Sequence, residues 1–495
     1  MRKDILKPLL FILIIASCNS IDPITNNSND SNNNIDTVEN NNQFCENCIK
    51  SYDFDILTLG VGPEGEIVDE PKVPAALTIR SLDSVYFEGT IGIEIRGESS
   101  QFFDKKSYGF ETWDAQYNDI DVALIGFPEE EDWILYGPFS DKSLIRNKLI
   151  YELSNQMGRY ATKTEFVELT INYEYKGLYI FMEKLKRDKN RINIEKISNN
   201  DETGGYIIEV NHSDNSVLSE NEYFISSPSN SIGGGAILFE FYYPEYDDIT
   251  KNQKKYIQSF ISNFETVLTS PFYSDSLIYF EEWVDIDSAI DFFLIEELAK
   301  SIDGYRGSTF FYKNKESINN KLFFGPIWDF NLAFGISSSC EGDEYFGWTN
   351  DASCTAGNIN WFNYFKADSI YANKVHCRWK ELRNSVLSFD SILGKIDSIT
   401  TKINGSINRN FLQWNQNITP LIYAVKIENL KTWIINRINW LDNNMIGACE
   451  GDIYDAIDRG NLIKITDFLG RETNNKGFQL HIYENSYVEK KYIIK

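Results

Sequence analysis

The chain has 495 residues, of which 42% are hydrophobic and 14% aromatic, so it can bury a substantial core and is not disordered overall. Its 73 acidic against 47 basic residues give a net charge of −26, which repels nucleic acid and anionic lipid headgroups. Composition therefore indicates a large globular protein, in one domain or two closely packed lobes, and argues against DNA or RNA as a partner.

The amino terminus has the pattern of a lipoprotein signal peptide, predicted over residues 1–18. A basic start, MRKDILK, precedes PLLFILII, an apolar stretch too short to cross a bilayer. Residues 15–18, Ile-Ala-Ser-Cys, which begin with the last residue of this stretch, resemble a lipobox, so that cleavage would leave Cys18 as the lipid-bearing first residue. An ordinary signal peptide with an incidental cysteine is the alternative. We expect an extracytoplasmic protein, lipid-anchored through Cys18 to a bacterial membrane. The outer membrane is favoured, and periplasm or cell surface remains open.

A flexible tether is predicted over residues 19–49. This Asn-rich tract has too little apolar surface to fold, and we expect it to hold the following domain away from the membrane. The main domain is predicted over residues 50–445, followed by a short β-rich tail over residues 446–495.

The cysteines suggest disulfides rather than a metal centre. Setting Cys18 aside leaves six of the seven, an even number that is compatible with bridges in an exported protein. Cys340 and Cys354 frame a loop rich in Gly, Asp and Ser, and are the first choice for a pair. The three histidines are scattered, so a zinc centre or a Ser/His/Asp hydrolase has no local support.

The main domain alternates between strand and helix patterns, which predicts an α+β fold with a mixed sheet. Residues 91–97, IGIEIRG, alternate apolar and polar positions as a half-buried strand does. Residues 178–183, LYIFME, follow a turn and also predict a strand, with Glu183 on a face that can take a polar side chain. Helices are predicted at residues 143–158, 287–300 and 432–444, the second apolar nearly all round and therefore buried.

The tail has a turn-rich centre and alternating ends, which predicts a short β hairpin. It resembles the C-terminal segments of secreted Bacteroidetes-type proteins, including part of their secretion-sorting domains. Because a lipobox and a sorting tail are redundant for surface display, we take the lipobox as the signal and the tail as an accessory element.

Two acidic residues follow apolar segments a short distance apart: Asp303 in SIDGYRGSTFFYKN and Asp329 in FFGPIWDFNLAFG. Phosphoryl transfer needs one carboxylate to accept a proton from the attacking hydroxyl and another to hold a divalent metal. Taken alone, an Asp at a strand or turn boundary is more often a helix cap or a turn residue. A glycan-processing pair of carboxylates is a further alternative.

Several phrases together resemble the CotH family of spore-coat-like secreted kinases, in order and spacing as well as in wording. They are RGESS, KKSY, DKSLIRN, YKGLY and GPIWDFN, within residues 91–112, 131–158, 168–185 and the two Asp segments. The resemblance covers roughly residues 52–444, and the combination is specific although each phrase alone is weak.

The resemblance implies an atypical protein-kinase-like fold that uses ATP and Mg²⁺ (or Mn²⁺) to phosphorylate Ser or Thr hydroxyls of a protein. Asp303 is similar to the catalytic-loop aspartate, and Asp329 to the metal-binding aspartate. By the same resemblance, Lys106 corresponds to the lysine at the nucleotide phosphates and Glu183 to an acidic residue near the nucleotide.

RGESSQ, which follows a predicted strand, is the best candidate for a phosphate-contacting turn, because it offers backbone amides and the side chains of Arg96, Ser99 and Ser100.

The sequence departs from the better-known kinase pattern at two positions that concern the metal. Ser308 stands where a kinase catalytic loop has a metal-binding Asn, and Asn331 where the spore-coat form tends to have a second Asp. Both are neutral oxygen donors, which can complete a Mg²⁺ shell but bind the ion more weakly. A catalytically degenerate surface lipoprotein that binds a partner is therefore the second functional hypothesis.

Overall fold

The computed structural model describes residues 55–62, 66–81, 84–198, 200–211, 222–226, 237–269, 278–351, 359–449, 462–467, 471–473, 477–483 and 488–493. The predicted signal peptide, Cys18, the tether and Cys354 lie outside the described residues. Among the described helices, none has the length and apolar character needed to cross a membrane.

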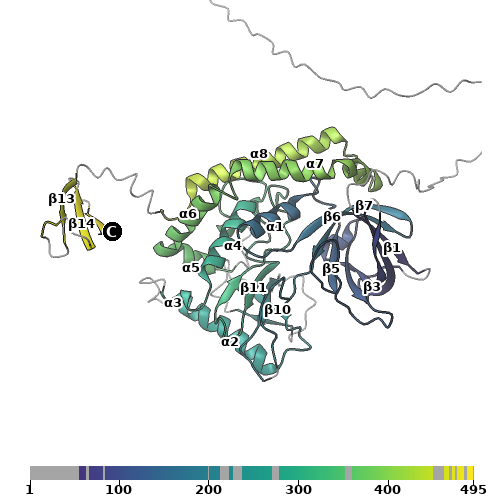
Figure 1. Cartoon of the computed structure of the whole chain (residues 1–495), viewed down its shortest axis with the longest axis horizontal. Helices are drawn as coiled ribbons and strands as arrows, with labels where there is room; N and C mark the ends of the chain where they lie inside the picture. The colour runs from purple at the N-terminus through teal and green to yellow at the C-terminus, as the bar shows by residue number, and fades with distance from the viewer. Residues whose placement is uncertain are drawn as a thin grey trace, which may run out of the picture. The chain divides into compact units, whose positions relative to one another are not determined.

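The first half of the main domain is a closed barrel of seven strands in the order β1-β2-β3-β4-β5-β7-β6 (Figure 1). The strands are β1 Asp55–Val61, β2 Val73–Arg80, β3 Val85–Arg96, β4 Ser107–Trp113, β5 Asp132–Tyr136, β6 Thr164–Ile171 and β7 Glu174–Glu183. Neighbours are antiparallel except β1 and β6, whose parallel pairing closes the barrel. The sequence predicted a mixed sheet but not its closure.

The barrel strands follow the predicted alternation. Ile91 and Ile93 of β3 are fully buried inside the barrel. In β7, Tyr179 and Phe181 point into the barrel core, whereas the even-numbered residues of the strand, such as Ile180, join the core beneath the helices. Strand β7 is therefore buried on both faces, and it links the two halves of the domain.

The second half combines an antiparallel sheet, in the order β12-β11-β8-β10-β9, with helices. The strands are β8 Tyr206–Asn211, β9 Tyr223–Ile225, β10 Leu238–Tyr243, β11 Thr309–Lys313 and β12 Leu322–Phe324. The α-helices are α1 Arg146–Gln156, α2 Lys251–Leu268, α3 Ile278–Glu281, α4 Ile286–Ala299, α5 Trp361–Ala367, α6 Ser369–Arg383, α7 Phe389–Gln413 and α8 Pro420–Asn444. Short 3-10 helices are η2 Ser99–Phe102, η6 Ser339–Glu341 and η7 Thr349–Asp351.

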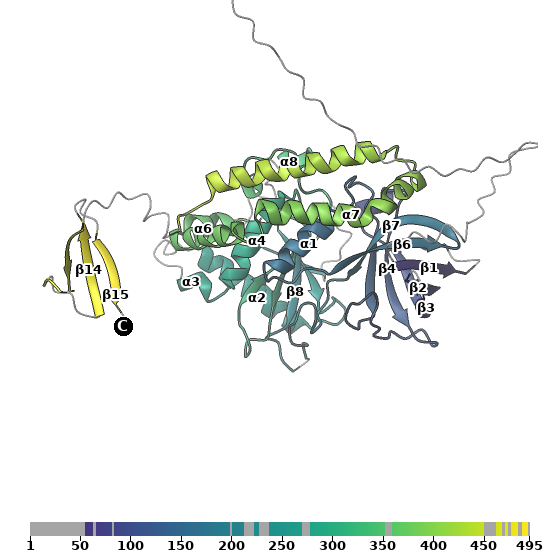
Figure 2. The same cartoon turned by 45° about the horizontal axis from the view of Figure 1, so that its top comes forward.

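The central helix α4 confirms the predicted buried helix. Asp285 caps its first turn by accepting the N–H of Ser288 at 2.8 Å, and every residue of the helix except Asp287 is buried. Helices α7 and α8 lie side by side above it (Figures 1 and 2). The predicted last helix is the end of α8, which begins earlier than expected because Thr419 caps it and Pro420 occupies its first position.

Helix α1 begins at Arg146 rather than at the predicted Ser143. Asp141 accepts the N–H groups of Ser143 and Arg146, at 2.9 and 3.0 Å, and Leu144 has a positive φ of 65°. These contacts form a turn in place of the first predicted helical residues.

The tail forms an antiparallel sheet of three strands instead of a single hairpin: β13 Leu462–Thr466, β14 Gly477–Tyr483 and β15 Val488–Ile493. A disulfide joins Cys377 in α6 to Cys449, beyond the end of α8. Cys340 is also disulfide-bonded. The predicted pairing of Cys340 with Cys354 stays a prediction, because Cys354 lies outside the described residues.

Candidate functional site

A cavity of about 370 Å³ lies between the barrel and the helical half of the domain. We call it the carboxylate cavity. The barrel contributes the ends of β3, β5 and β7 to its wall, and the helical half contributes α1, β8 and two loops. The charged, hydroxyl-bearing and amide-bearing residues that line it are Arg96, Glu98, Ser100, Ser107, Tyr136, Asn147, Tyr151, Glu209, Asp303, Ser308, Asp329 and Asn331.

Asp303 lies in the loop between α4 and β11. Its backbone carbonyl accepts the N–H of Gly307 at 2.9 Å, and its carboxylate lies 3.6 Å from the guanidinium of Arg306. Tyr305, fully buried, donates its hydroxyl to Glu297 of α4 at 3.0 Å and so fixes the loop to the core. Ser308 ends the loop with a φ of 47°, in the left-handed region.

Asp329 follows β12 and is held on two sides. Its N–H donates to the hydroxyl of Tyr151 at 3.1 Å, and the side-chain amide of Asn331 donates to its Oδ1 at 2.6 Å. Asp329 has a φ of 58°, a conformation that costs roughly 1–3 kcal/mol and is typically kept at functional sites. Burial and the nearby charge of Asp303 raise the pKa of Asp329 to about 6, while Arg96 acts in the opposite direction.

Arg96 is the basic residue of the carboxylate cavity. It ends β3, and its guanidinium lies 5.6 Å from the ring centroid of Trp328, next to Asp329 in the chain. Gly97 then turns with a φ of 94°, and the 3-10 helix η2 brings Ser100 to the cavity. The side chain of Ser99 lies outside the described residues.

Lys106 and Glu183, which the resemblance placed near the nucleotide, do not line the carboxylate cavity with Asp303 and Asp329. Lys106 Nζ donates to the carbonyls of Gln101 and Phe103, each at 2.7 Å, and so closes the turn after η2. Glu183 is 1% exposed and accepts the Tyr160 hydroxyl at 3.1 Å and a backbone N–H at 3.0 Å. Lys105, the residue before Lys106, is also buried and does not line the cavity.

Several polar residues of the cavity were missed by the sequence reasoning, among them Glu209 and Asn147. Glu209 stands in the middle of the apolar strand β8; burial, with the charges of Glu240 and Asp329, raises its pKa well above the usual range. Asn147 of α1 is 5% exposed, and its Oδ1 has no hydrogen-bond partner. A glutamate within YIIEV was the available signal for the first, and the Asn of SLIRNK for the second.

The oxygen atoms around the cavity suit a hard divalent cation. Asp329 and Asp303 offer carboxylates, while Asn331 and Ser308 offer neutral oxygens, and Mg²⁺ prefers such ligands together with water. The buried Oδ1 of Asn147, without a partner, is a further oxygen that a ligand or its hydration shell would satisfy. The residues present therefore fit the metal that the resemblance implies.

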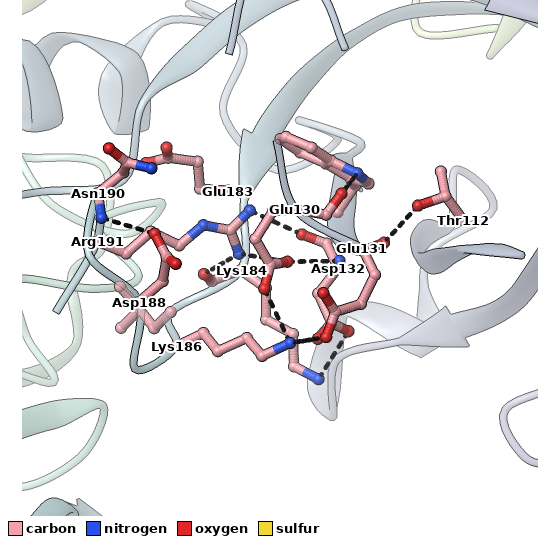
Figure 3. A network of polar contacts seen from close by, with 12 residues as sticks. Thr112, Glu130, Glu131, Asp132, Glu183, Lys184, Lys186, Asp188, Asn190 and Arg191 are labelled. Carbon is pink, nitrogen blue, oxygen red and sulfur yellow. Dashed lines mark hydrogen bonds and ion pairs between the residues drawn. The ribbon is translucent and has the colours of Figure 1, made fainter. Parts of the chain in front are cut away.

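A second acidic group, away from this cavity, is already neutralised. Carboxylate oxygens of Asp121, Glu130 and Glu131 lie within 4.8 Å of one another. Lys186 Nζ lies 2.9 Å from Glu130 and 2.8 Å from Asp132, with a further contact to Glu131 (Figure 3). This lysine occupies the place of a cation, so the group is an ion-pair network.

The cavity thus combines carboxylates, the guanidinium of Arg96 and oxygen atoms that can bind a metal. Comparison with known families agrees with this arrangement. The family model described as CotH kinase protein matches residues 93–441, more than half of the chain. The chain therefore belongs to the CotH kinase family. This match supports a kinase-like function and use of a protein substrate in general.

A solved structure with partial similarity is described as the crystal structure of a Helicobacter pylori proinflammatory kinase, CtkA. The match covers 65% of this chain and 92% of that chain, with 10% sequence identity and a TM-score of 0.28, which is too low to support an argument. No curated protein matches this chain.

Proposed function

We propose that this protein is a membrane-tethered secreted kinase that transfers the γ-phosphate of ATP to Ser or Thr hydroxyls of a protein. In this proposal the barrel and the helical half are the two lobes of an atypical protein-kinase-like fold. The observation that supports it is that side chains from four distant segments, Arg96, Glu209, Asp303 and Asp329, line one cavity.

Each residue has a role that follows from its position. Asp303 is partly exposed at the cavity and accepts the proton of the acceptor hydroxyl. Asp329, with Asn331 and Ser308, holds Mg²⁺ or Mn²⁺, which neutralises phosphate charge when bound. Arg96 takes the part at the nucleotide phosphates that the resemblance gave to Lys106, because Lys106 is engaged with two backbone carbonyls.

A phosphotransfer assay tests this proposal. The purified protein without its signal peptide and tether is incubated with labelled ATP and Mg²⁺ or Mn²⁺, and self-phosphorylation is measured. Asp303→Asn should reduce the rate of self-phosphorylation by about 10²–10⁴-fold, because it removes the proton acceptor. Asp329→Asn should also reduce this rate, because it removes a metal ligand. Asp287→Asn, an exposed position on α4, is the matched control and should leave the rate unchanged. Equal background from the wild type and both cavity variants would refute the enzyme.

The degenerate alternative remains a second candidate because Ser308 and Asn331 are neutral. A calorimetric titration separates the two, since micromolar ATP binding that requires Mg²⁺ would count against a protein that retains only the fold. A glycan-processing pair is disfavoured, because that chemistry does not require a basic residue such as Arg96 in the cavity of the two aspartates.

The lipid anchor is part of the proposal and rests on the sequence alone. Cys18→Ala should move the protein from the membrane fraction to the soluble fraction, and it should prevent incorporation of labelled fatty acid. Retention of both signals in the variant would contradict the anchor.

A further inference from the structure

A second cavity, of about 290 Å³, has an unusual charge for this protein. We call it the basic pocket. Its basic residues are Lys142, Arg146 and Lys426, its apolar wall includes Phe334 and Trp433, and none of the described residues that line it carries a carboxylate. The chain as a whole has a net charge of −26, so this pocket is a local exception.

The two lysines of the basic pocket are not paired with acids, whereas its arginine is. Arg146 lies 2.5 Å from Asp141. Lys142 donates to the carbonyl of Phe139 at 2.6 Å, and Lys426 is exposed on α8; neither forms an ion pair within the described part of the chain. The pKa of Lys142 is lowered by burial and by the charge of Lys426, against the opposing effect of Asp141.

The other lysine on the same helix differs from Lys426. Lys431 lies 2.6 Å from Asp397 and 3.2 Å from Glu428, in two ion pairs. Lys142 and Lys426 line the same pocket and repel each other, an effect that Asp141 offsets only in part, and an anionic ligand would relieve the repulsion. The basic pocket is therefore complementary to an anion.

The basic pocket shares a wall with the carboxylate cavity. Arg146 lines the pocket and the next residue, Asn147, lines the cavity; likewise Leu332 lines the cavity and Phe334 lines the pocket. Arg146 Nε donates to the carbonyl of Ala333 at 2.9 Å, which joins the two parts of this wall. A peptide that crosses it would have one residue in each cavity with only a few positions between them.

We propose that the basic pocket binds an acidic side chain of the protein substrate, a carboxylate or an attached phosphate, a few residues from the acceptor hydroxyl. This proposal rests on the kinase function proposed above. Lys142 and Lys426 bind the anion, and the indole of Trp433 covers the neighbouring peptide. The site would favour acidic over neutral sequences around the acceptor, despite the negative charge of the whole chain.

Binding can be measured without catalysis, by fluorescence anisotropy of labelled serine peptides in the absence of ATP. The probes are a peptide with several aspartates, the same peptide with asparagines, and one with a phosphoserine. A hydrogen bond to a charged group contributes about 1.5–3 kcal/mol. The double variant Lys142→Gln, Lys426→Gln should therefore bind the acidic peptides at least about tenfold more weakly. Lys431→Gln, on the same helix, should change their affinity by less than about twofold.

Several results would overturn this proposal. The first is equal affinity for the aspartate and asparagine peptides. The second is a loss of affinity in Lys431→Gln as large as in the double variant. The third is that the protein binds inorganic phosphate but neither the aspartate nor the phosphoserine peptide. Lys426→Glu, at an exposed position, gives an independent test if the double variant folds poorly, and it should weaken binding further.

The two proposals can fail separately. Peptide binding without phosphotransfer would refute the kinase and leave the pocket, whereas phosphotransfer with unchanged KM for acidic peptides in Lys426→Glu would refute the pocket alone. Self-phosphorylation of the control variant Lys431→Gln should stay near the wild-type rate, because Lys431 lines neither cavity.

Discussion

Metal binding at Asp329 should depend on pH in a way that the cavity determines. Burial, together with the charge of Asp303, raises the pKa of Asp329 from 3.8 to about 6. A metal ligand must be deprotonated, so protons compete with the metal below this pH. With a pKa of about 6, roughly one tenth of the carboxylate is ionised at pH 5 and nearly all at pH 7.5.

The dissociation constant for Mn²⁺ should therefore be about tenfold higher at pH 5 than at pH 7.5, and nearly constant above pH 7. Free Mn²⁺ can be counted by electron paramagnetic resonance, which needs no nucleotide or activity. The same pKa has an opposite effect on the metal-free fold: the protein should lose stability as the pH rises from about 4 to about 6, because only the folded state still holds the proton.

Asp329→Asn is the decisive variant, since it should bind Mn²⁺ weakly and without this pH dependence. Glu209→Gln is the comparison, because Glu209 also lines the cavity and also has a raised pKa. The reasoning is refuted if the wild type binds equally at both pH values, or if the dependence survives in Asp329→Asn and disappears in Glu209→Gln.

Two further predictions concern the cations of the domain. Arg96→Met should weaken ATP binding about tenfold or more in calorimetry, whereas Lys106→Met should leave ATP affinity unchanged and lower stability by about 1–3 kcal/mol through its two lost hydrogen bonds. Glu297→Gln should lower the free energy of unfolding in urea by about 3–5 kcal/mol, because the fully buried Arg437, 3.1 Å from Glu297, would lose its partner charge. Glu428→Gln, which removes the partner of Lys431 at the surface, should lower it by less than about 1 kcal/mol.

The strand and helix patterns that follow from local periodicity could be predicted from the sequence. The alternation in β3 and the uniform apolar character of α4 both correspond to the observed burial. The closure of the barrel could not be predicted, because it depends on the pairing of β1 with β6, more than a hundred residues apart.

The site residues show where periodicity stops being informative. Alternation placed Glu183 on one face of β7, but both faces of this strand are buried. The carboxylate of Glu183 contacts Tyr160 and does not line the cavity. Of the two adjacent lysines in KKSY, Lys105 bonds to the carbonyl of Leu178 at 2.6 Å and Lys106 closes a turn. Sequence can find a charged residue in an apolar segment, but only the fold shows what it faces.

The phrase DKSLIRN illustrates how one short motif can serve structure and function together. Asp141 and Arg146 form a buried pair, and the guanidinium also donates to the carbonyls of Ala333 and Phe334, at 2.9 and 3.3 Å. These bonds fix the segment that follows Asp329. Asp329 itself has a positive φ, a strained conformation that the surrounding structure must hold in place. Because the next residue, Asn147, lines the cavity, the first turn of α1 both holds the segment after Asp329 and forms part of the site.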